Sequence, residues 1–182
     1  MKDIKTIFKG FHRPLGLPAF LCPTGRLRKN EGKMLTKLVT FTDSCAYEIK
    51  KEKQGDWNKL FGVCFGILGI HRHSIRFGWR WNISKQKIEI CYIIYDGKRI
   101  ERTQIAFCDC ELNREYHFNI TWILKDDRTL DVTFHPLQYD VEEHLNVPIK
   151  ARRFFGCGFY FGGKSRAPHR ITAKLQQISK VI

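Results

Sequence analysis

The fold is decided by the stretch Ser74–Pro136, which opens with the run SIRFGWRWN at residues 74–82. Successive side chains of a strand point to opposite faces, so the apolar residues of each alternating run share one face. We expect that face to form the core, and its members are Ile75, Phe77, Trp79, Trp81, Tyr116, Phe118, Ile120, Trp122, Leu130, Val132 and Phe134. Four alternating runs separated by turn-forming residues predict a β-meander.

The rest of the chain also indicates short strands and almost no helix. Apolar runs predict strands over 34–47, 60–70, 87–95, 98–107, 153–161 and 170–178, and the glycines within 60–70 indicate a bent or bulged strand. Asp96-Gly97 is typical of a two-residue type I′ hairpin turn. Residues 50–58 are expected to form a polar loop, and 138–145 is the single candidate helix. This pattern predicts an all-β protein, an antiparallel β-sandwich or jelly roll.

The 182 residues divide into two unequal parts. Residues 1–32 are rich in Gly, Pro and basic residues, and Pro14, Pro18 and Pro23 argue against a long helix or a central strand there. We expect an extended N-terminal arm that lies on the body or on a neighbouring subunit. Residues 33–182 contain no linker or internal repeat, so they are expected to form one β-sandwich domain.

The chain carries a formal net charge of +14. Such a charge attracts polyanions, so an acidic glycan, nucleic acid, an anionic membrane surface or an acidic protein partner is electrostatically compatible. The basic residues are spread along the chain and do not form a tail. Charge alone therefore leaves both a solvated basic surface and a specific polyanion site open.

The cysteines and the start of the chain bear on the compartment. Seven cysteines, scattered mostly among apolar neighbours, indicate buried thiols in a reducing environment, because an odd number cannot all pair within a monomer. Charge interrupts the N-terminal residues before any signal-peptide-like apolar run, and no segment approaches the roughly 20 apolar residues of a membrane span. We expect a soluble cytoplasmic or virion protein that needs no cofactor and for which homo-oligomers are possible.

The polar residues of the alternating runs form a candidate ligand site. They would line one sheet face if their strands are neighbours, and they are Arg76, Arg80, His117, Asn119, Thr121 and His135, together with Asp131 and Thr133. Arginine can bind a carboxylate through two parallel hydrogen bonds, and Asn and Thr bond to hydroxyls, so this face suits an acidic sugar. The alternative is an ordinary solvated face, since one face of an antiparallel sheet is commonly wet and polar.

Three segments resemble a known group of proteins: Arg76–Trp81, Tyr92–Arg99 with its Asp-Gly pair, and Tyr160-Phe161-Gly162-Gly163 followed by Ala167-Pro168-His169. Together they resemble uncharacterised β-sandwich proteins of Bacteroidetes and their phages, which are similar to the concanavalin-A-like jelly rolls. The resemblance covers roughly Met34–Ile178 and implies a fold, whereas this fold hosts lectins, lyases, hydrolases and capsid components alike.

The resemblance extends to alginate-lyase-like jelly rolls, which carry an Arg-rich strand, a Gln/His strand and a C-terminal strand with a Tyr. It would place Arg76, His117 and Tyr160 of this chain in the catalytic positions, although the tight lyase motifs are absent. In such a reaction a Tyr or His removes the proton next to the uronate carboxylate, and Arg neutralises that carboxylate.

Several other motifs are weighed and set aside. His71-Arg72-His73 and Cys108-Asp109-Cys110 each place two possible zinc ligands on one strand face, but neither has a second pair, so we expect loop histidines, buried or turn thiols, and no metal. Gly163-Lys164-Ser165 lacks the spacing and the following helix of a phosphate-binding loop. The tryptophans are expected in the core, apart from Trp57 in a polar loop.

These observations favour a non-catalytic β-sandwich that binds or assembles, either a phage virion or structural component or an acidic-glycan-binding module. The first alternative is a polysaccharide-lyase-like enzyme that acts on acidic glycans. The second is a nucleic-acid binder that works by charge alone.

Overall fold

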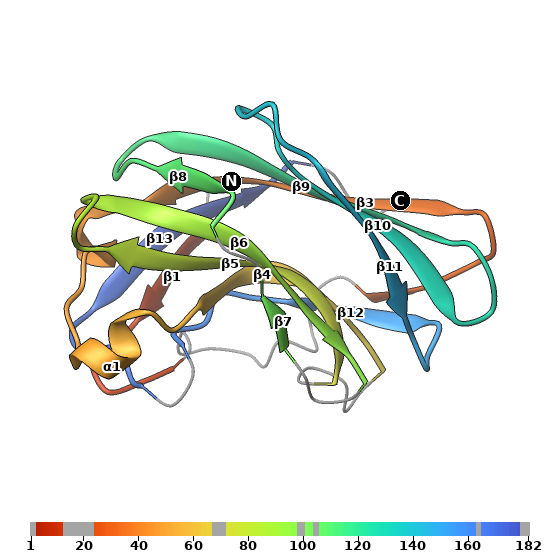
Figure 1. The fold of residues 1–182 in the computed structure, drawn as a ribbon, viewed down its shortest axis with the longest axis horizontal. Helices are drawn as coiled ribbons and strands as arrows, with labels where there is room; N and C mark the ends of the chain where they lie inside the picture. The colour runs from red at the N-terminus through yellow and green to blue at the C-terminus, as the bar shows by residue number, and fades with distance from the viewer. Residues whose placement is uncertain are drawn as a thin grey trace.

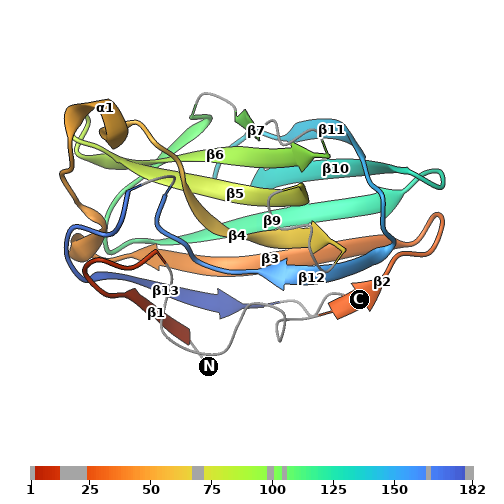
Figure 2. The same ribbon diagram turned by 90° about the horizontal axis from the view of Figure 1, so that it is seen from below.

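The computed structural model describes residues 3–12, 24–66, 72–97, 101–103, 106–162 and 165–178. Two antiparallel sheets pack face to face as a jelly-roll β-sandwich, as Figure 1 and Figure 2 show. Sheet A contains, in spatial order, β1 (Asp3–Ile7), β13 (Ile171–Gln177), β3 (Gly32–Phe41), β9 (Glu115–Leu124), β10 (Thr129–Pro136) and β11 (Glu143–Pro148). The predicted fold class is confirmed.

Sheet B lies on the other side of the core (Figure 1). Its strands are β2 (Thr24–Arg26), β12 (Arg153–Cys157), β4 (Asn58–Phe65), β5 (His73–Asn82), β6 (Lys87–Asp96) and β7 (Glu101–Thr103), and β8 (Cys108–Cys110) also pairs with β6. The described helices are a 3-10 turn η2 (Asp43–Cys45) and α1 (Lys51–Gln54), so the predicted loop over 50–58 contains one helical turn. Among the described residues, no helix is long and apolar enough to cross a membrane.

The core is built from the apolar faces that the alternating runs predict. All of the residues assigned to those faces are buried in one hydrophobic cluster between the sheets. Aromatic rings join the layers: Phe77 of β5 lies 5.1 Å from Phe118 of β9 and 5.3 Å from Phe134 of β10, measured between ring centroids. The prediction of a buried alternating face is therefore confirmed for β5, β9 and β10.

Strand β4 carries the irregularity that its glycines predict. Its pairing with β5 shifts register between Lys59 and Phe61, and all residues of β4 are buried. The predicted strand continued to Ile70, but residues 67–71 lie outside the described part of the chain. The bulge is confirmed within the described part.

The predicted helix over 138–145 is wrong. A turn follows β10, and β11 begins at Glu143 and pairs antiparallel with β10. Val147 is buried in the main core and Leu145 packs against it, so strand alternation places both where β10 needs an apolar partner. Pairing with β10 outweighs the weak local preference for helix.

The predicted two-residue turn at Asp96-Gly97 is also wrong. Asp96 still pairs with His73 as the last residue of β6, and the pairing with β7 begins at Tyr95 and Glu101. Gly97 does adopt a positive φ of 98°, the conformation that favours glycine. Residues 98–100, which complete the connection, are outside the described part.

The described parts of the N-terminal region belong to the sheets. β1 pairs with β13 at the edge of sheet A, and β2 pairs with β12 in sheet B. Pro14, Pro18 and Pro23 lie outside the described residues. The division into an arm of residues 1–32 and a domain of residues 33–182 therefore stays a prediction.

Candidate functional site

The sandwich separates the residues that the sequence places on one polar face. Arg76 and Arg80 lie on β5 of sheet B, whereas β9 and β10, which carry the other predicted ligands, lie in sheet A. The apolar faces of both sheets point into the core, so their polar faces point away from each other. The condition that the strands are neighbours therefore holds only within sheet A, among His117, Asn119, Thr121, Asp131, Thr133 and His135.

The polar face of sheet A bonds largely to itself. Thr36 donates a hydrogen bond of 2.9 Å to Asn119, and the Thr133 hydroxyl lies 3.1 Å from Nδ1 of His144. Neighbouring contacts join Lys125 to Asp131 at 3.0 Å and His135 to Glu142 at 3.9 Å. These contacts fit the solvated-face alternative, because the side chains satisfy one another across an open sheet surface.

Arg80 is held by protein groups on three sides. Its Nε donates to Glu89 at 2.7 Å, its Nη1 donates to the Gly55 carbonyl at 2.9 Å, and the guanidinium lies 4.2 Å from the ring centroid of Trp57. Trp57 is consequently half-buried and not exposed as expected. These contacts give Arg80 a structural role at this corner of sheet B.

The three residues assigned to lyase chemistry are not gathered. Arg76 is buried on sheet B, where Nε donates to Ser74 at 3.1 Å and the guanidinium lies 5.6 Å from the ring centroid of Tyr95. Tyr160 bridges to Lys59 on the same side of the molecule and stacks on His12, with ring centroids 5.4 Å apart. His117, the proposed base, lies on β9 of sheet A.

The cysteine and histidine motifs do not form a metal site in the described part of the chain. No group of three or more His, Cys, Asp or Glu side chains is placed there to hold a metal ion. The described cysteines are buried free thiols, as expected, and burial raises the pKa of the Cys110 thiol. His71 lies outside the described residues, and His73 is a buried strand residue and not the loop residue expected.

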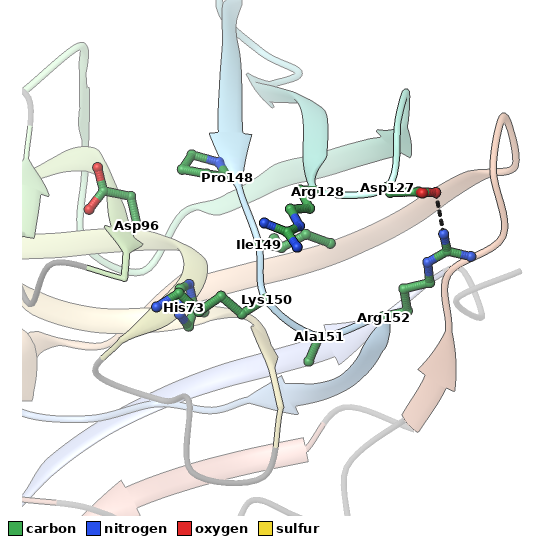
Figure 3. A pocket seen from close by; sticks show the side chains of 9 residues that line it. All are labelled: His73, Asp96, Asp127, Arg128, Pro148, Ile149, Lys150, Ala151 and Arg152. Atoms are coloured by element: carbon green, nitrogen blue, oxygen red, sulfur yellow. Dashed lines mark hydrogen bonds and ion pairs between the residues drawn. The ribbon is translucent and has the colours of Figure 1, made fainter.

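A cavity of about 540 Å³ opens at the end of the sandwich where β5 begins and β6 ends, shown in Figure 3. Three connections meet there: the β5–β6 end, the turn between β9 and β10, and the link between β11 and β12. The lining residues are His73, Asp96, Asp127, Arg128, Pro148, Ile149, Lys150, Ala151 and Arg152, a set we call the end pocket.

The end pocket carries excess positive charge. Arg152 forms an ion pair with Asp127 at its rim (Figure 3). Arg128 and Lys150 also line it, are exposed, and form no ion pair with any residue that the structure describes. A backbone hydrogen bond of 2.7 Å from Ile149 to the Arg128 carbonyl ties the two connections together. Two cations without counter-ions thus face a preformed cavity.

His73 supplies the buried polar atom of the end pocket. Its side chain is 7% exposed, and Nδ1 has no hydrogen-bond partner within the described structure. Burial and the positive charge of Lys150 lower the pKa of His73, against the opposing effects of Asp96 and the Pro148 carbonyl. The imidazole is therefore neutral at neutral pH, and one ring nitrogen keeps a lone pair.

Sequence reasoning missed this site. It considered His73 only as a metal ligand and gave no role to Arg128 or Lys150. The pocket residues come from connections that are 31 or more positions apart in the chain, as from Asp96 to Asp127. No local spacing joins them, and only the exposed cations next to predicted strand ends were visible as a signal.

Comparison with solved structures places the fold among jelly-roll β-sandwiches. Alginate lyase Aly36B aligns with a TM-score of 0.60 and 11% identity over 97% of this chain and 79% of its own. Alginate lyase AlyC3 aligns at 0.56 and 11%, over 96% and 72%. The endo-β-1,4-glucuronan lyase of the fungus Trichoderma reesei aligns at 0.54 and 8%, over 97% and 78%. At these identities the similarity establishes the fold alone.

No protein-family model and no curated protein sequence matches the chain. The class that the structure defines is therefore a concanavalin-A-like jelly-roll sandwich with a basic pocket at one end.

Proposed function

We propose that this protein is a non-catalytic binding module for acidic glycans and that the end pocket holds a uronate unit. The observation that carries the proposal is the pairing of two cations without counter-ions, Arg128 and Lys150, with the buried imidazole of His73 in one cavity. The volume of about 540 Å³ falls within the range of ordinary small-ligand sites.

The chemistry of the lining fits a sugar acid. Arg128 presents a planar guanidinium that can bind a carboxylate through two parallel hydrogen bonds, and Lys150 adds a point charge. His73 offers a neutral polar nitrogen between them. The fold neighbours support the same ligand class, because two are named as alginate lyases and one as a glucuronan lyase.

The arrangement of the predicted catalytic residues favours binding without turnover. Proton abstraction requires the base within hydrogen-bond reach of the reacting carbon while a cation neutralises the carboxylate. His117 lies on sheet A, and the buried Arg76 and Tyr160 lie on the side of sheet B. We expect no unsaturated uronate product when the protein is incubated with alginate or glucuronan, as followed by ultraviolet absorbance.

The proposal is tested by calorimetric titration with an alginate or glucuronan trisaccharide. Arg128→Ala and Lys150→Ala should each weaken binding about tenfold, since a hydrogen bond to a charged group contributes about 1.5–3 kcal/mol. Lys51→Ala removes the same charge from exposed helix α1, away from the pocket, and should leave the affinity within about twofold. Equal losses in all three variants, or no binding by the wild type, would contradict the proposal.

Two alternatives use no pocket and are distinguished by a separate measurement. An assembly role would make the protein a virion component, and charge-driven binding would make nucleic acid its partner. Size-exclusion chromatography with light scattering, at low and high salt, detects a large assembly or co-purified nucleic acid. A nucleic-acid-free particle of monomer or small-oligomer size is the expected result for a cytoplasmic glycan-binding module.

A further inference from the structure

We propose that His73 makes the end pocket selective for hydroxylated carboxylates over carboxylates that lack hydroxyl groups. This inference rests on the proposed function and adds to it, because it assigns the hydroxyl-reading group and separates sugar acids from other anions. It is carried by the buried, unpartnered Nδ1 of His73 beside two cations.

The ring of His73 is fixed in place by its surroundings. His73 pairs with Asp96 across β5 and β6, and the ring packs against the backbone of Gly97. A Cβ at position 97 would lie only 2.4 Å from Cε1 of His73, so this close approach requires glycine. Figure 3 shows the Lys150 side chain extending beside the same ring. The imidazole is thus a preorganised part of the cavity wall.

The hydrogen-bonding roles of the two ring nitrogens follow from their neighbours. The carbonyl of Pro148 is an acceptor and interacts with the imidazole, so the ring nitrogen that faces it carries the proton. Nδ1 has no hydrogen-bond partner, which assigns the proton to Nε2. In the neutral ring Nδ1 is then an acceptor, and its lone pair requires a donor from the ligand.

The acceptor at Nδ1 complements the two cations. Arg128 and Lys150 carry only N–H donors, which a carboxylate satisfies. A carboxylate is itself an acceptor and cannot bond to a neutral Nδ1, whereas a hydroxyl donates to it. A ligand that satisfies all three groups therefore combines a carboxylate with a nearby hydroxyl, which is the defining feature of a uronate ring.

The charged groups around His73 keep this acceptor available. Lys150, on the link from β11 to β12, and Arg72, before β5, oppose protonation of the ring. Asp96 of β6 favours it, but burial and the two cations dominate, and the pKa stays below its ordinary value. A pocket that must present a lone pair at neutral pH gains from this balance.

The matched probes for this inference are glucuronate and tetrahydropyran-2-carboxylate, which share the ring and the carboxylate and differ in the hydroxyls. We expect wild-type protein to bind glucuronate about tenfold more tightly in an NMR titration, because a buried acceptor left unpaired penalises the other probe. His73→Phe should bring both probes to the same weak affinity. His73→Asn, which offers an oxygen acceptor near the Nδ1 position, should keep part of the preference.

His144→Phe is the control, since His144 is 64% exposed at its side chain on the polar face of sheet A. Equal affinity of the wild type for the two probes, or a preference that survives in His73→Phe, would overturn the role of His73. The comparison of probes on the wild type decides the question even if His73→Phe does not fold. Failure of both probes and of the trisaccharide to bind would instead overturn the proposed function.

Discussion

At the scale of single residues, the carboxylate of Glu89 organises one corner of sheet B. It accepts hydrogen bonds from Arg80 at 2.7 Å and Asn82 at 2.8 Å, and Lys85 lies 3.0 Å away. Burial alone would raise the pKa of Glu89, but the bonds from Asn82, Arg80 and Lys85 outweigh burial and lower it. The charged carboxylate therefore stabilises the folded state above its ordinary pKa of 4.5, and this contribution is lost as the pH falls below it.

Glu89→Gln should lower the free energy of unfolding by about 2 kcal/mol, because it leaves the Arg80 guanidinium without its anionic partner. Urea denaturation at neutral pH measures this loss. Glu52→Gln in helix α1 is the matched control, since Glu52 is exposed, and should change stability by less than about 0.5 kcal/mol. Equal stability of the two variants would show that the Glu89 network is not a stabilising unit.

His73 should give stability its own pH dependence. Burial and Lys150 lower the pKa of His73 in the folded state, so the unfolded chain binds the proton more readily. The free energy of unfolding of the wild type should fall as the pH drops below 6.5, the ordinary pKa of histidine. In His73→Asn this part of the decrease should be missing when urea unfolding is compared on both sides of that pH. An unchanged pH profile in the variant would contradict the assignment.

At the scale of elements, β4 and β5 approach each other most closely next to the β4 bulge. A Cβ at Gly62 would lie 2.1 Å from the Ile75 carbonyl oxygen and 2.6 Å from Cα of Arg76. Both are backbone atoms in the neighbouring strand, so the contact cannot be relieved by turning a side chain. The glycine is therefore required for the pairing that places Arg76 and His73.

Gly62→Ala should destabilise the fold by about 3 kcal/mol through overpacking. Gly158→Ala is the control, because nothing lies within 4 Å of a Cβ built there. Thermal and urea denaturation of the two variants measure the difference. A Gly62→Ala protein as stable as Gly158→Ala would mean that β4 and β5 are less tightly paired than described.

Alternation along the chain predicts elements whose core face is apolar and whose partner is close in sequence. It gives β5, β9 and β10 with the correct buried residues, since each has bulky apolar residues at every second position. It fails for β11, where only Leu145 and Val147 face the core and the pairing with β10 decides the structure. It fails at Asp96, because the long-range pairing with His73 extends β6 past the expected turn.

At the scale of the whole molecule, sequence shows which side chains share a strand face but not which sheet holds the strand. Arg76 and His117 therefore both appeared outward-facing, and the sandwich places them in opposite sheets. The end pocket is less predictable still, because its basic residues and His73 meet only where three connections converge. Chain topology creates this site, and no local motif encodes it.

Salt dependence distinguishes the pocket from the general positive charge. A trisaccharide held by Arg128 and Lys150 should show an affinity that falls with a log–log salt slope of about −2 or shallower, one step per cation. Binding spread over the surface of a chain with net charge +14 would involve more cations and a steeper slope. Calorimetric titrations at several salt concentrations measure it, and a slope of about −5 would assign binding to the surface as a whole.

The most direct test of the central claim is an amide chemical-shift map of the 15N-labelled protein titrated with an alginate or glucuronan trisaccharide. The account predicts that the perturbed amides cluster at His73, at Asp127–Arg128 and at residues 149–152. The polar face of sheet A around His117 and Asn119 should remain unaffected. Perturbations centred on β9 and β10, or none at saturating ligand, would contradict the end pocket as the glycan site.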